Sequence, residues 1–587
     1  MKEAPALVFE TVSKTFVAGG MTVKALDSVD IQTRPGRVTG LIGPDGAGKT
    51  TLMRLAVGLL IPDTGHIQAM GIDVVQQPLA VQSSVGYMPQ RFGLYEDLTV
   101  QENLDLYADL QSVPKDERAA RYHELMHMTG LAPFTRRLAG QLSGGMKQKL
   151  GLACTLVRSP HLLLLDEPTV GVDPVSRLEL WQIVYRQVRD EGMSVLLSTA
   201  YLDEAERCDE VILMHQGKRL GQGTPASFSE PMRGRSFHVS APSISKRTMQ
   251  GQLSAVPGIV DAIIEGEQVR AVTLESGMPV LPEALAHTEG LTIIPAEPSF
   301  EDAFIATLRG KEAPATPPVV TTNAQSVTST PDDGTVIKVQ DLQRRFGDFY
   351  AVKGVSFSVQ RGEIFGLLGA NGAGKSTTFR MLCGLLPVSA GEVHVAGLDL
   401  RHAAARVRGR LGYMAQRFSL YVDLTVLQNL RFFASAYGLR RAHARQRIAW
   451  ALEAFELADY ANASAGDLPL GYKQRLAMAA ALMHEPDILF LDEPTSGVDP
   501  LARREFWQRI NALAESGVTV LVTTHFMDEA NYCDRLVIMA EGEVLAEGTP
   551  ADMKSRFRSV KTPDPTMEDA FIGLIEAHEN KQQDIAV

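Results

Sequence analysis

The same eight-residue pattern occurs twice in this chain of 587 residues, as GPDGAGKT at Gly43–Thr50 and as GANGAGKS at Gly369–Ser376. Both stretches fit the phosphate-binding P-loop, in which glycines let successive backbone N–H groups point at a phosphate chain. Lys49 and Lys375 would place a cation on the phosphates, and the final threonine or serine would offer a hydroxyl to Mg²⁺. We expect a helix to begin at each lysine, so that its positive N-terminal end faces the phosphates.

The P-loops belong to a long internal repeat, which indicates two homologous domains. Three pairs of residues are each 326 positions apart: Lys49 and Lys375, Gln90 and Gln416, and Asp166 and Asp492. In each copy an apolar stretch precedes the P-loop and a second apolar stretch precedes the aspartate. Fully apolar strands that alternate with helical patterns are typical of a mainly parallel sheet. We therefore predict an α/β fold with two tandem P-loop NTPase domains, each carrying a helical subdomain in its polar middle.

The sequence divides the whole chain into five parts. Residues 1–235 and 335–560 are the two copies, and 236–310, which have no full counterpart, are predicted to form a small α+β appendage. The absence of a nucleotide motif there suggests a regulatory or dimer-bracing role. Residues 311–334 are rich in Pro, Thr, Ser and Ala and are predicted to be a flexible linker. A short C-terminal helix and tail are expected over 561–587.

The composition limits the possible functions. The net charge of −12 argues against a broad nucleic-acid interface. No apolar run is long enough to predict a membrane span. The four cysteines are scattered and form neither a metal-binding nor a disulfide pattern.

Acidic pairs follow the second apolar strand of each copy, at Asp166-Glu167 and Asp492-Glu493. An aspartate at the end of a buried strand beside a P-loop is placed for Mg²⁺. The adjacent glutamate can act as a general base on the attacking water. Gln90 and Gln416, which follow a Gly-Tyr-Met stretch in each copy, could contact the metal or that water.

The first copy also contains Leu142-Ser-Gly-Gly-Met-Lys-Gln148, and with this stretch the chain resembles ABC-transporter ATPases. The resemblance implies that ATP lies between the P-loop of one domain and the signature of the other, in a head-to-tail pair within the chain. It implies roles for the adenine-stacking Phe16 and Phe346, for Asp173 and Asp499 at the dimer seam, and for the switch histidine His525. The implied catalytic residues are Glu493, His525, Gln416 and Glu167, and the implied Mg²⁺ ligands are Thr50, Gln90, Asp166, Ser376, Gln416 and Asp492. The implied ATP-binding residues are Phe16, Gly43, Pro44, Asp45, Gly46, Ala47, Gly48, Lys49, Thr50, Thr51, Ser143, Gly144, Gly145, Phe346, Gly369, Ala370, Asn371, Gly372, Ala373, Gly374, Lys375, Ser376 and Thr377.

More narrowly, the chain is similar to tandem ATP-binding subunits of ABC-2-type multidrug exporters. The stretches that carry this likeness are RFGLYEDLTV at Arg91–Val100, RFSLYVDLTV at Arg417–Val426, and the Glu-Asp-Ala-Phe endings at Phe304 and Phe571. The likeness implies two separate ABC-2-type permease subunits, possible contact with a periplasmic adaptor, and a peripheral position on the cytoplasmic face of the inner membrane. The implied permease contacts are Phe92, Leu94, Tyr95, Phe418, Leu420 and Tyr421; the alternative is that these side chains only pack the helical subdomain.

The two copies differ at two positions that matter for chemistry. The signature of the second copy is altered to Leu468-Pro-Leu-Gly, in which Pro469 lacks both the serine hydroxyl and a backbone N–H. His525 of the second copy aligns with Ala200 of the first, which cannot form a hydrogen bond through its side chain. With head-to-tail pairing, both defects fall on the site of Lys49, and the site of Lys375 is complete.

Three other functions share features with this sequence. A tandem sugar-import ATPase and a ribosome-associated ABC protein acting in translation also combine two such domains. His123-Glu-Leu-Met-His127 matches the zinc-peptidase pattern H-E-x-x-H, but the second copy has Ala449 and Glu453 at the matching positions. We expect these histidines to lie on the surface of a helix.

Overall fold

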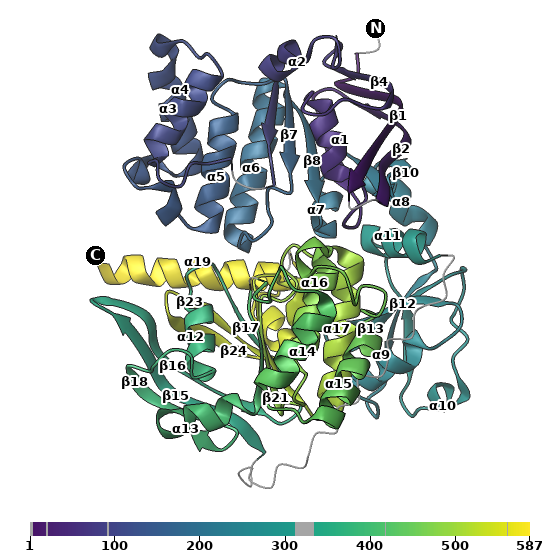
Figure 1. The fold of residues 1–587 in the computed structure, drawn as a ribbon, viewed down its shortest axis with the longest axis vertical. Coiled ribbons are helices and arrows are strands. Elements are labelled where there is room, and N and C mark those ends of the chain that lie inside the picture. The colour runs from purple at the N-terminus through teal and green to yellow at the C-terminus, as the bar shows by residue number, and fades with distance from the viewer. Residues whose placement is uncertain are drawn as a thin grey trace. The chain divides into compact units, whose positions relative to one another are not determined.

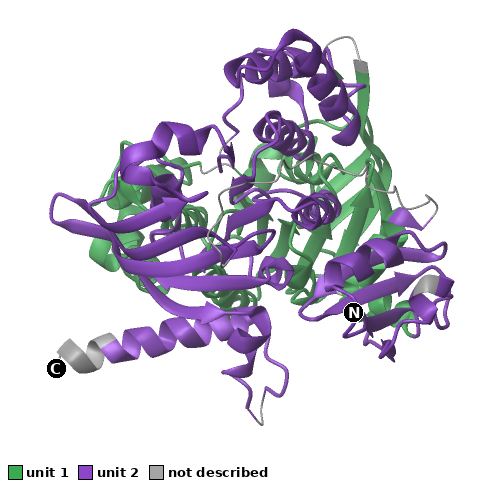
Figure 2. Ribbon diagram, turned by 90° about the horizontal axis from the view of Figure 1, so that it is seen from below, with its two compact units in different colours: residues 1–233, 298–308 green, residues 234–297, 309–587 purple. Residues whose placement is uncertain are grey.

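The computed structural model describes two compact units (Figure 2). Unit 1 comprises residues 1–233 and 298–308, and unit 2 comprises 234–297 and 309–587. Within them the structure describes residues 4–18, 21–90, 93–310, 334–416, 418–559 and 562–586. The linker expected at 311–334 lies outside these ranges except for Gly334.

Unit 1 holds the first copy of the repeat, which builds two sheets (Figure 1). The antiparallel sheet has the order β2-β1-β4-β5, with β1 at Leu7–Ala18, β2 at Met21–Thr33, β4 at Thr64–Ala69 and β5 at Ile72–Asp73. The larger sheet has the order β10-β9-β3-β8-β7-β6, with β3 at Val38–Ile42, β6 at Val85–Met88, β7 at Leu162–Asp166, β8 at Ser194–Thr199, β9 at Glu210–His215 and β10 at Lys218–Gly223. Only β10 runs antiparallel to its neighbour. The predicted mainly parallel sheet is confirmed.

The helices of unit 1 fall into two groups. Those next to the large sheet are α1 (Lys49–Ala56), α2 (Pro78–Ser84), α6 (Pro174–Glu191), α7 (Leu202–Glu206) and α8 (Pro225–Ser229). The helical subdomain consists of α3 (Val100–Leu110), α4 (Lys115–Thr129) and α5 (Gly144–Thr155). As expected, α1 begins at the P-loop lysine. A capping box between Thr99 and Glu102 fixes the start of α3.

The second copy in unit 2 repeats this topology. Its antiparallel sheet has the order β16-β15-β18-β19, with β15 at Thr335–Phe346, β16 at Phe349–Gln360, β18 at Ala390–Val395 and β19 at Leu398–Asp399. Its larger sheet has the order β20-β21-β22-β17-β23-β24, with β17 at Ile364–Gly369, β20 at Leu411–Met414, β21 at Ile488–Asp492, β22 at Thr519–Thr524, β23 at Arg535–Ala540 and β24 at Glu543–Gly548. The helices are α12 (Lys375–Leu382), α13 (Leu400–Arg408), α14 (Val426–Ala436), α15 (Arg441–Ala454), α16 (Leu470–Ala481), α17 (Pro500–Glu515) and α18 (Pro550–Ser555).

The appendage folds as β11 (Ser236–Ser240), α9 (Lys246–Ser254), β12 (Ile259–Glu265), β13 (Gln268–Thr273), α10 (Glu283–Ala286) and β14 (Thr292–Pro295). Its antiparallel sheet has the order β12-β13-β11-β14. This β-α-β-β-α-β succession with the first and third strands at the centre is the ferredoxin-like arrangement.

The appendage docks on the second copy through buried polar contacts. Asp261 in β12 forms ion pairs with Arg504 from α17 and with Arg309, whose Nη1 donates to Oδ1 at 2.9 Å. Asn511, also on α17, donates to Gln250 of α9 at 2.7 Å. The first copy has Leu178 and Tyr185 at the positions of Arg504 and Asn511. These contacts therefore depend on residues that only the second copy carries.

The two Glu-Asp-Ala-Phe endings form matching helix starts. In α11 (Phe300–Arg309), Asp302 accepts from the backbone N–H of Ser299, and in α19 (Met567–Ala586), Asp569 accepts in the same way from Thr566. Phe304 and Phe571 are buried. The repeated motif thus caps a helix and anchors it by one aromatic ring. At 20 residues, α19 is longer than the short helix expected.

We predict that Asp261→Asn destabilises unit 2. The substitution leaves Arg504, which is fully buried, without its counter-charge, and breaking a buried ion pair typically costs roughly 3–5 kcal/mol. Urea denaturation should show a lower unfolding midpoint. Asp190→Asn, which breaks an exposed pair with Arg189, is the control and should leave the midpoint nearly unchanged. Equal midpoints for both variants would contradict a structural role for the buried pair.

Candidate active sites

The P-loops require glycine immediately before α1 and α12. Gly48 has φ 100° and Gly374 has φ 95°, both in the left-handed region. A Cβ atom on Gly48 would lie 2.4 Å from the carbonyl oxygen of Ala25, and one on Gly374 would lie 2.6 Å from that of Ala351. Any side chain would therefore clash with a backbone group, so the loop can curl tightly only with glycine.

The P-loop lysines are buried and their amines lie inside the loop. Lys49 Nζ donates to the carbonyl oxygens of Gly43 at 2.7 Å and Pro44 at 3.2 Å. It also lies 3.9 Å from the carboxylate of Glu167. In the second copy, Lys375 Nζ is 2.7 Å from the Gly369 carbonyl oxygen and 4.0 Å from Glu493. Each site thus holds a cation between the loop and a glutamate.

The strand-end aspartates connect three elements of each copy. Thr50 Oγ1 at the start of α1 lies 3.3 Å from Asp166 Oδ1, and Ser198 Oγ of β8 donates to the same oxygen at 2.7 Å. The second copy has the same arrangement, with 3.3 Å from Ser376 and 2.6 Å from Thr523 to Asp492 Oδ1. The structure brings together the hydroxyl and carboxylate predicted to hold Mg²⁺.

The glutamates that follow adopt a strained backbone conformation. Glu167 has φ 51° and Glu493 has φ 46°, which for a residue with a side chain costs on the order of 1–3 kcal/mol. A hydrogen bond offsets part of this conformational cost, since the backbone N–H of Glu493 donates to Thr523 Oγ1 at 3.0 Å. Gln90 Nε2 donates to Glu167 at 2.7 Å and Gln416 Nε2 donates to Glu493 at 2.6 Å. Each predicted glutamine therefore holds the carboxylate of the predicted base.

The two glutamates differ in their pKa. Burial raises the pKa of Glu167, and Lys49 and Gln90 offset this only in part. Burial also acts to raise the pKa of Glu493, but the hydrogen bond and charge of His525, with smaller contributions from Lys375 and Gln416, lower it to about 2. His525 Nδ1 lies 3.1 Å from Glu493 Oε2, whereas the first copy has Ala200 at this place. A single side chain, His525, therefore accounts for much of the difference in pKa between the two predicted bases.

The signature segments also differ. Ser143 caps α5 by accepting from the N–H of Met146 at 3.3 Å, and a Cβ atom on Gly145 would lie 2.6 Å from Ser176 Oγ. In the second copy, Pro469 occupies the capping position of α16 without a side-chain hydrogen bond. The altered segment thus keeps the helix but lacks the hydroxyl.

Comparisons with known proteins agree with this geometry. The family described as "ABC transporter" matches residues 26–170 and 352–496. The chain is 53% identical over 559 residues, which are 95% of this chain and 96% of the relative, to the "Probable multidrug ABC transporter ATP-binding protein YbhF" of Escherichia coli (strain K12). The chain belongs to the ABC transporter family. It is an ATPase with two tandem ABC domains.

Two further relatives match over a single domain. The "Nod factor export ATP-binding protein I" of Burkholderia orbicola (strain AU 1054) is 45% identical over 36% of this chain and 71% of its own length. The "Linearmycin resistance ATP-binding protein LnrL" of Bacillus subtilis (strain 168) is 40% identical over 38% of this chain and 71% of its own length. These relatives do not favour the sugar-import or ribosome-associated alternatives.

The remaining ABC residues lie as follows. Phe16 and Phe346, near the ends of β1 and β15, are partly exposed, as the predicted adenine-stacking role requires. Asp173 and Asp499 cap α6 and α17 of their own domains.

His123 and His127 lie on α4, and the described part of the chain holds no cluster of three or more His, Cys, Asp or Glu side chains placed for a metal ion. None of the described helices is long and apolar enough to cross a membrane.

Sequence reasoning missed a buried glutamate in each ABC domain. Glu204 accepts from Thr199 at 2.6 Å, from Thr169 at 3.0 Å and from the indole of Trp181 at 3.0 Å. Glu529 accepts likewise from Thr495 and Thr524 in the second domain. These hydrogen bonds tie the loop after each Asp-Glu pair to the neighbouring strand. The shared Thr-x-x-x-Asp-Glu-Ala spacing, which begins at the last residue of β8 and of β22, was the available signal.

One predicted permease contact is wrong. Leu420 is buried and belongs to the core cluster that includes apolar residues of α14 and α16. Tyr95 and Tyr421 are 59% and 51% exposed, which confirms the expectation that these rings lie partly at the surface. Leu94 and Phe418 are partly buried, and Phe92 lies outside the described residues.

The effect of His525 on Glu493 gives a prediction about pH. A carboxyl with a lowered folded pKa contributes stability above its unfolded pKa of about 4.5, and this contribution is lost as the pH falls toward 2. His525→Ala should therefore lower the free energy of unfolding more at about pH 6 than at about pH 4. The comparison uses urea denaturation at both pH values. In a Glu493→Gln background the same histidine substitution should show no such difference, and a difference that persists there would contradict the coupling.

Proposed function

We propose that this chain powers export through two separate ABC-2-type permease subunits, bound at the cytoplasmic face of the inner membrane. The identity of 53% along nearly the whole chain to a protein named as a multidrug transporter subunit is the main support. The names of the single-domain relatives, which refer to export and to antibiotic resistance, point the same way. A periplasmic adaptor could complete the assembly. Drugs or other xenobiotics are the proposed cargo class.

Each domain has the residues to bind Mg²⁺ with ATP. The hydroxyl of Thr50 or Ser376 and the carboxylate of Asp166 or Asp492 are hard oxygen donors, which suit Mg²⁺ completed by phosphate oxygens and water. The bound metal would neutralise charge on the phosphates. Gln90 and Gln416 would stay close to the metal while holding the glutamate carboxylates. The P-loop N–H groups and lysines would bind the phosphate chain.

The hydrolytic step would be assisted by the protein's own carboxylate. Glu493 would accept a proton from the attacking water, and His525, buried beside it, would position that water against the γ-phosphate end. The strained backbone of Glu493 fixes the carboxylate at the strand end. Such preorganisation matters because a base must lie within hydrogen-bond reach of the proton it removes.

We further propose that the two ATP sites are unequal. If the domains pair head to tail within the chain, Lys375, Glu493 and His525 are completed by Ser143 and Gly145. Lys49 and Glu167 instead meet Ala200 and the altered segment at Pro469. The first site would then bind Mg-ATP and hold the domains together, and the second site would carry most of the hydrolysis. The support for this asymmetry is that His525 and the intact signature would meet at one site, and Ala200 and the altered signature at the other.

The asymmetry predicts unequal effects of two matched substitutions. Glu493→Gln keeps the shape and removes the base, which typically costs ~10²–10⁴-fold in rate. Glu167→Gln should cost far less, because its site already lacks the histidine and the intact signature. The measurement is the steady-state ATPase activity of the two variants, compared at equal nucleotide loading. Equal losses would contradict the asymmetric account, and a larger loss for Glu167→Gln would reverse it.

The exposed tyrosines predict the permease contact. Tyr95→Glu and Tyr421→Glu, made together, should release the chain from washed membranes because a charge opposes burial of an apolar interface. ATPase activity of the purified chain should stay close to that of the unmodified protein. The control is Leu274→Glu, at an exposed apolar residue of the appendage. Retention of the tyrosine variant on membranes, or recovery of the chain in salt-sensitive ribosome pellets instead, would contradict the proposal.

A further inference from the structure

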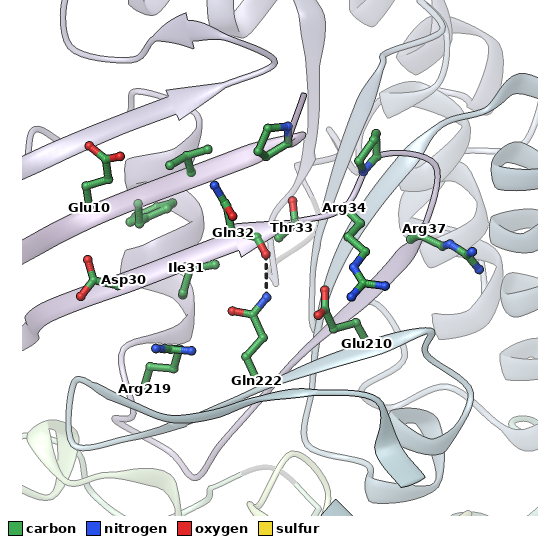
Figure 3. A pocket seen from close by; sticks show the side chains of 14 residues that line it. Glu10, Asp30, Ile31, Gln32, Thr33, Arg34, Arg37, Glu210, Arg219 and Gln222 are labelled. Carbon is green, nitrogen blue, oxygen red and sulfur yellow. Dashed lines mark hydrogen bonds between the residues drawn. The ribbon is translucent and has the colours of Figure 1, made fainter. Parts of the chain in front are cut away.

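A groove of about 800 Å³ lies in unit 1 beside β1, β2, β9 and β10 (Figure 3). Its lining includes three acidic and three basic side chains, and Gln222 at its wall donates to the Gln32 carbonyl oxygen at 2.6 Å. Charges of both signs favour no single class of ligand, so we assign none to this groove.

A buried carboxylate of the second copy, Glu529, is not used by the proposed mechanism. It lies in the 3₁₀ turn at Asp528–Tyr532 and is only 1% exposed. Its Oε1 accepts from the hydroxyl of Thr495, and its Oε2 accepts from that of Thr524 at 2.7 Å. Burying a carboxylate is costly unless donors or cations surround it, so this position depends on the two hydroxyl groups. Glu529 therefore joins two threonines that belong to different segments.

The two threonines lie next to the proposed catalytic residues. Thr495 comes two residues after Glu493, the proposed base, and Thr524 immediately precedes His525. Thr524 Oγ1 also accepts from the backbone N–H of Phe526 at 2.9 Å. The residues on both sides of the histidine are thus anchored to the same hydroxyl group. We call residues 524–526 the switch segment.

Arg503 of α17 connects the same two segments beside Glu529. Its Nη2 donates to the carbonyl oxygen of Val498 at 3.2 Å, in the loop that follows the proposed base. Its guanidinium lies over the ring of Phe526, 4.7 Å from the ring centroid. Arg503 Nε is 3.9 Å from Glu529 Oε1, which gives the carboxylate a cationic neighbour. The arginine and the glutamate together hold the loop after the base against the switch segment.

The first copy has the same carboxylate in different surroundings. Glu204 accepts from two threonines and from the indole of Trp181, so three neutral donors hold it. The equivalent indole of the second copy, Trp507, stacks on Tyr532 with ring centroids 4.7 Å apart, and its Nε1 has no hydrogen-bond partner among the described residues. Because Ala200 stands in place of the histidine, the first copy has no switch side chain to position.

We propose that Glu529 is a positioning residue for ATP hydrolysis in the second copy. It acts through its two threonine donors, which hold His525 against Glu493, and not through contact with the nucleotide. This inference rests on the proposed function, in which these two side chains act on the attacking water. A base works only within hydrogen-bond reach of the proton it removes, so a displaced histidine slows the chemical step. The P-loop contacts that bind ATP would be unaffected.

Steady-state ATPase kinetics of the full chain carrying Glu529→Gln test the proposal. The amide keeps the shape but has no charge, and its nitrogen cannot accept a hydrogen bond, so one threonine contact is lost. We expect kcat to fall about tenfold or more, as for loss of a charge-assisted hydrogen bond, with the KM for ATP within about twofold of its original value. The matched control is Glu363→Gln, which changes another buried carboxylate, at the end of β17 away from the P-loop. It should leave kcat within about twofold.

Two further comparisons separate positioning from a general structural role. In a His525→Ala background, Glu529→Gln should lower kcat by at most about twofold, because the side chain that it positions is gone. Thr524→Val removes the donor hydroxyl at nearly constant shape and should lower kcat as Glu529→Gln does. Thr524→Ser keeps the hydroxyl and should keep most of the activity. Thermal unfolding of each variant checks that the chain is folded.

The possible failures can be told apart. An unchanged kcat for His525→Ala would overturn the proposed role of the histidine, and this inference with it. A low kcat for His525→Ala with an unchanged kcat for Glu529→Gln would overturn the inference alone. A tenfold loss from Glu529→Gln that persists in the His525→Ala background would do the same, because it indicates a structural role. If Glu529→Gln does not fold, equal kcat values for Thr524→Val and Thr524→Ser overturn the inference.

Discussion

The hydrogen bonds to the strand-end aspartate hold each catalytic region together. Asp492 accepts from Ser376 at the start of α12 and from Thr523 of β22, so one carboxylate fixes the P-loop helix against two neighbouring strands. The same threonine hydroxyl accepts from the N–H of Glu493, which stabilises the strained backbone of that glutamate. The P-loop lysine, the oxygens proposed to bind Mg²⁺ and the proposed general base thereby reach one edge of a parallel sheet, where its strands end. Asp166 and Ser198 repeat the arrangement in the first domain.

Because the two domains share this framework, single substitutions within it account for the differences between their sites. The hydrogen-bond distances around the strand-end aspartate are nearly the same in the two copies. His525, however, is present in the second copy, and Ala200 takes its place in the first. Because the histidine lies 3.1 Å from Glu493, the pKa of that carboxyl falls to about 2, whereas burial raises the pKa of Glu167. The proposed division into an ATP-holding site and a hydrolysing site would thus come from local substitutions after duplication, with the fold unchanged. The contacts of the appendage also depend on local substitutions, because on α17 they use residues that the first copy lacks.

Sequence alone predicted those features that depend on local patterns. The glycines and lysine of each P-loop fix a strand, a turn and a helix start within ten residues, so α1 and α12 begin where expected. The sequence did not predict the Asp261–Arg504 pair or the hydrogen bonds of Glu204, since these join residues far apart in the chain and follow no period. Leu420 was placed wrongly because an apolar residue in a short loop segment has the same local pattern whether it packs inward or outward. The sequence also predicts a shorter helix than α19, because the polar residues near its end are typical of a tail.

The unequal use of two ATP molecules is the central claim, and a single-turnover experiment tests it most directly. The chain is loaded with two ATP per molecule in the presence of Mg²⁺, unbound nucleotide is removed, and the bound nucleotides are quantified over one turnover. The account predicts that one ATP is converted promptly to ADP while the other remains ATP on the same chain. Conversion of both ATP molecules at the same rate would contradict it.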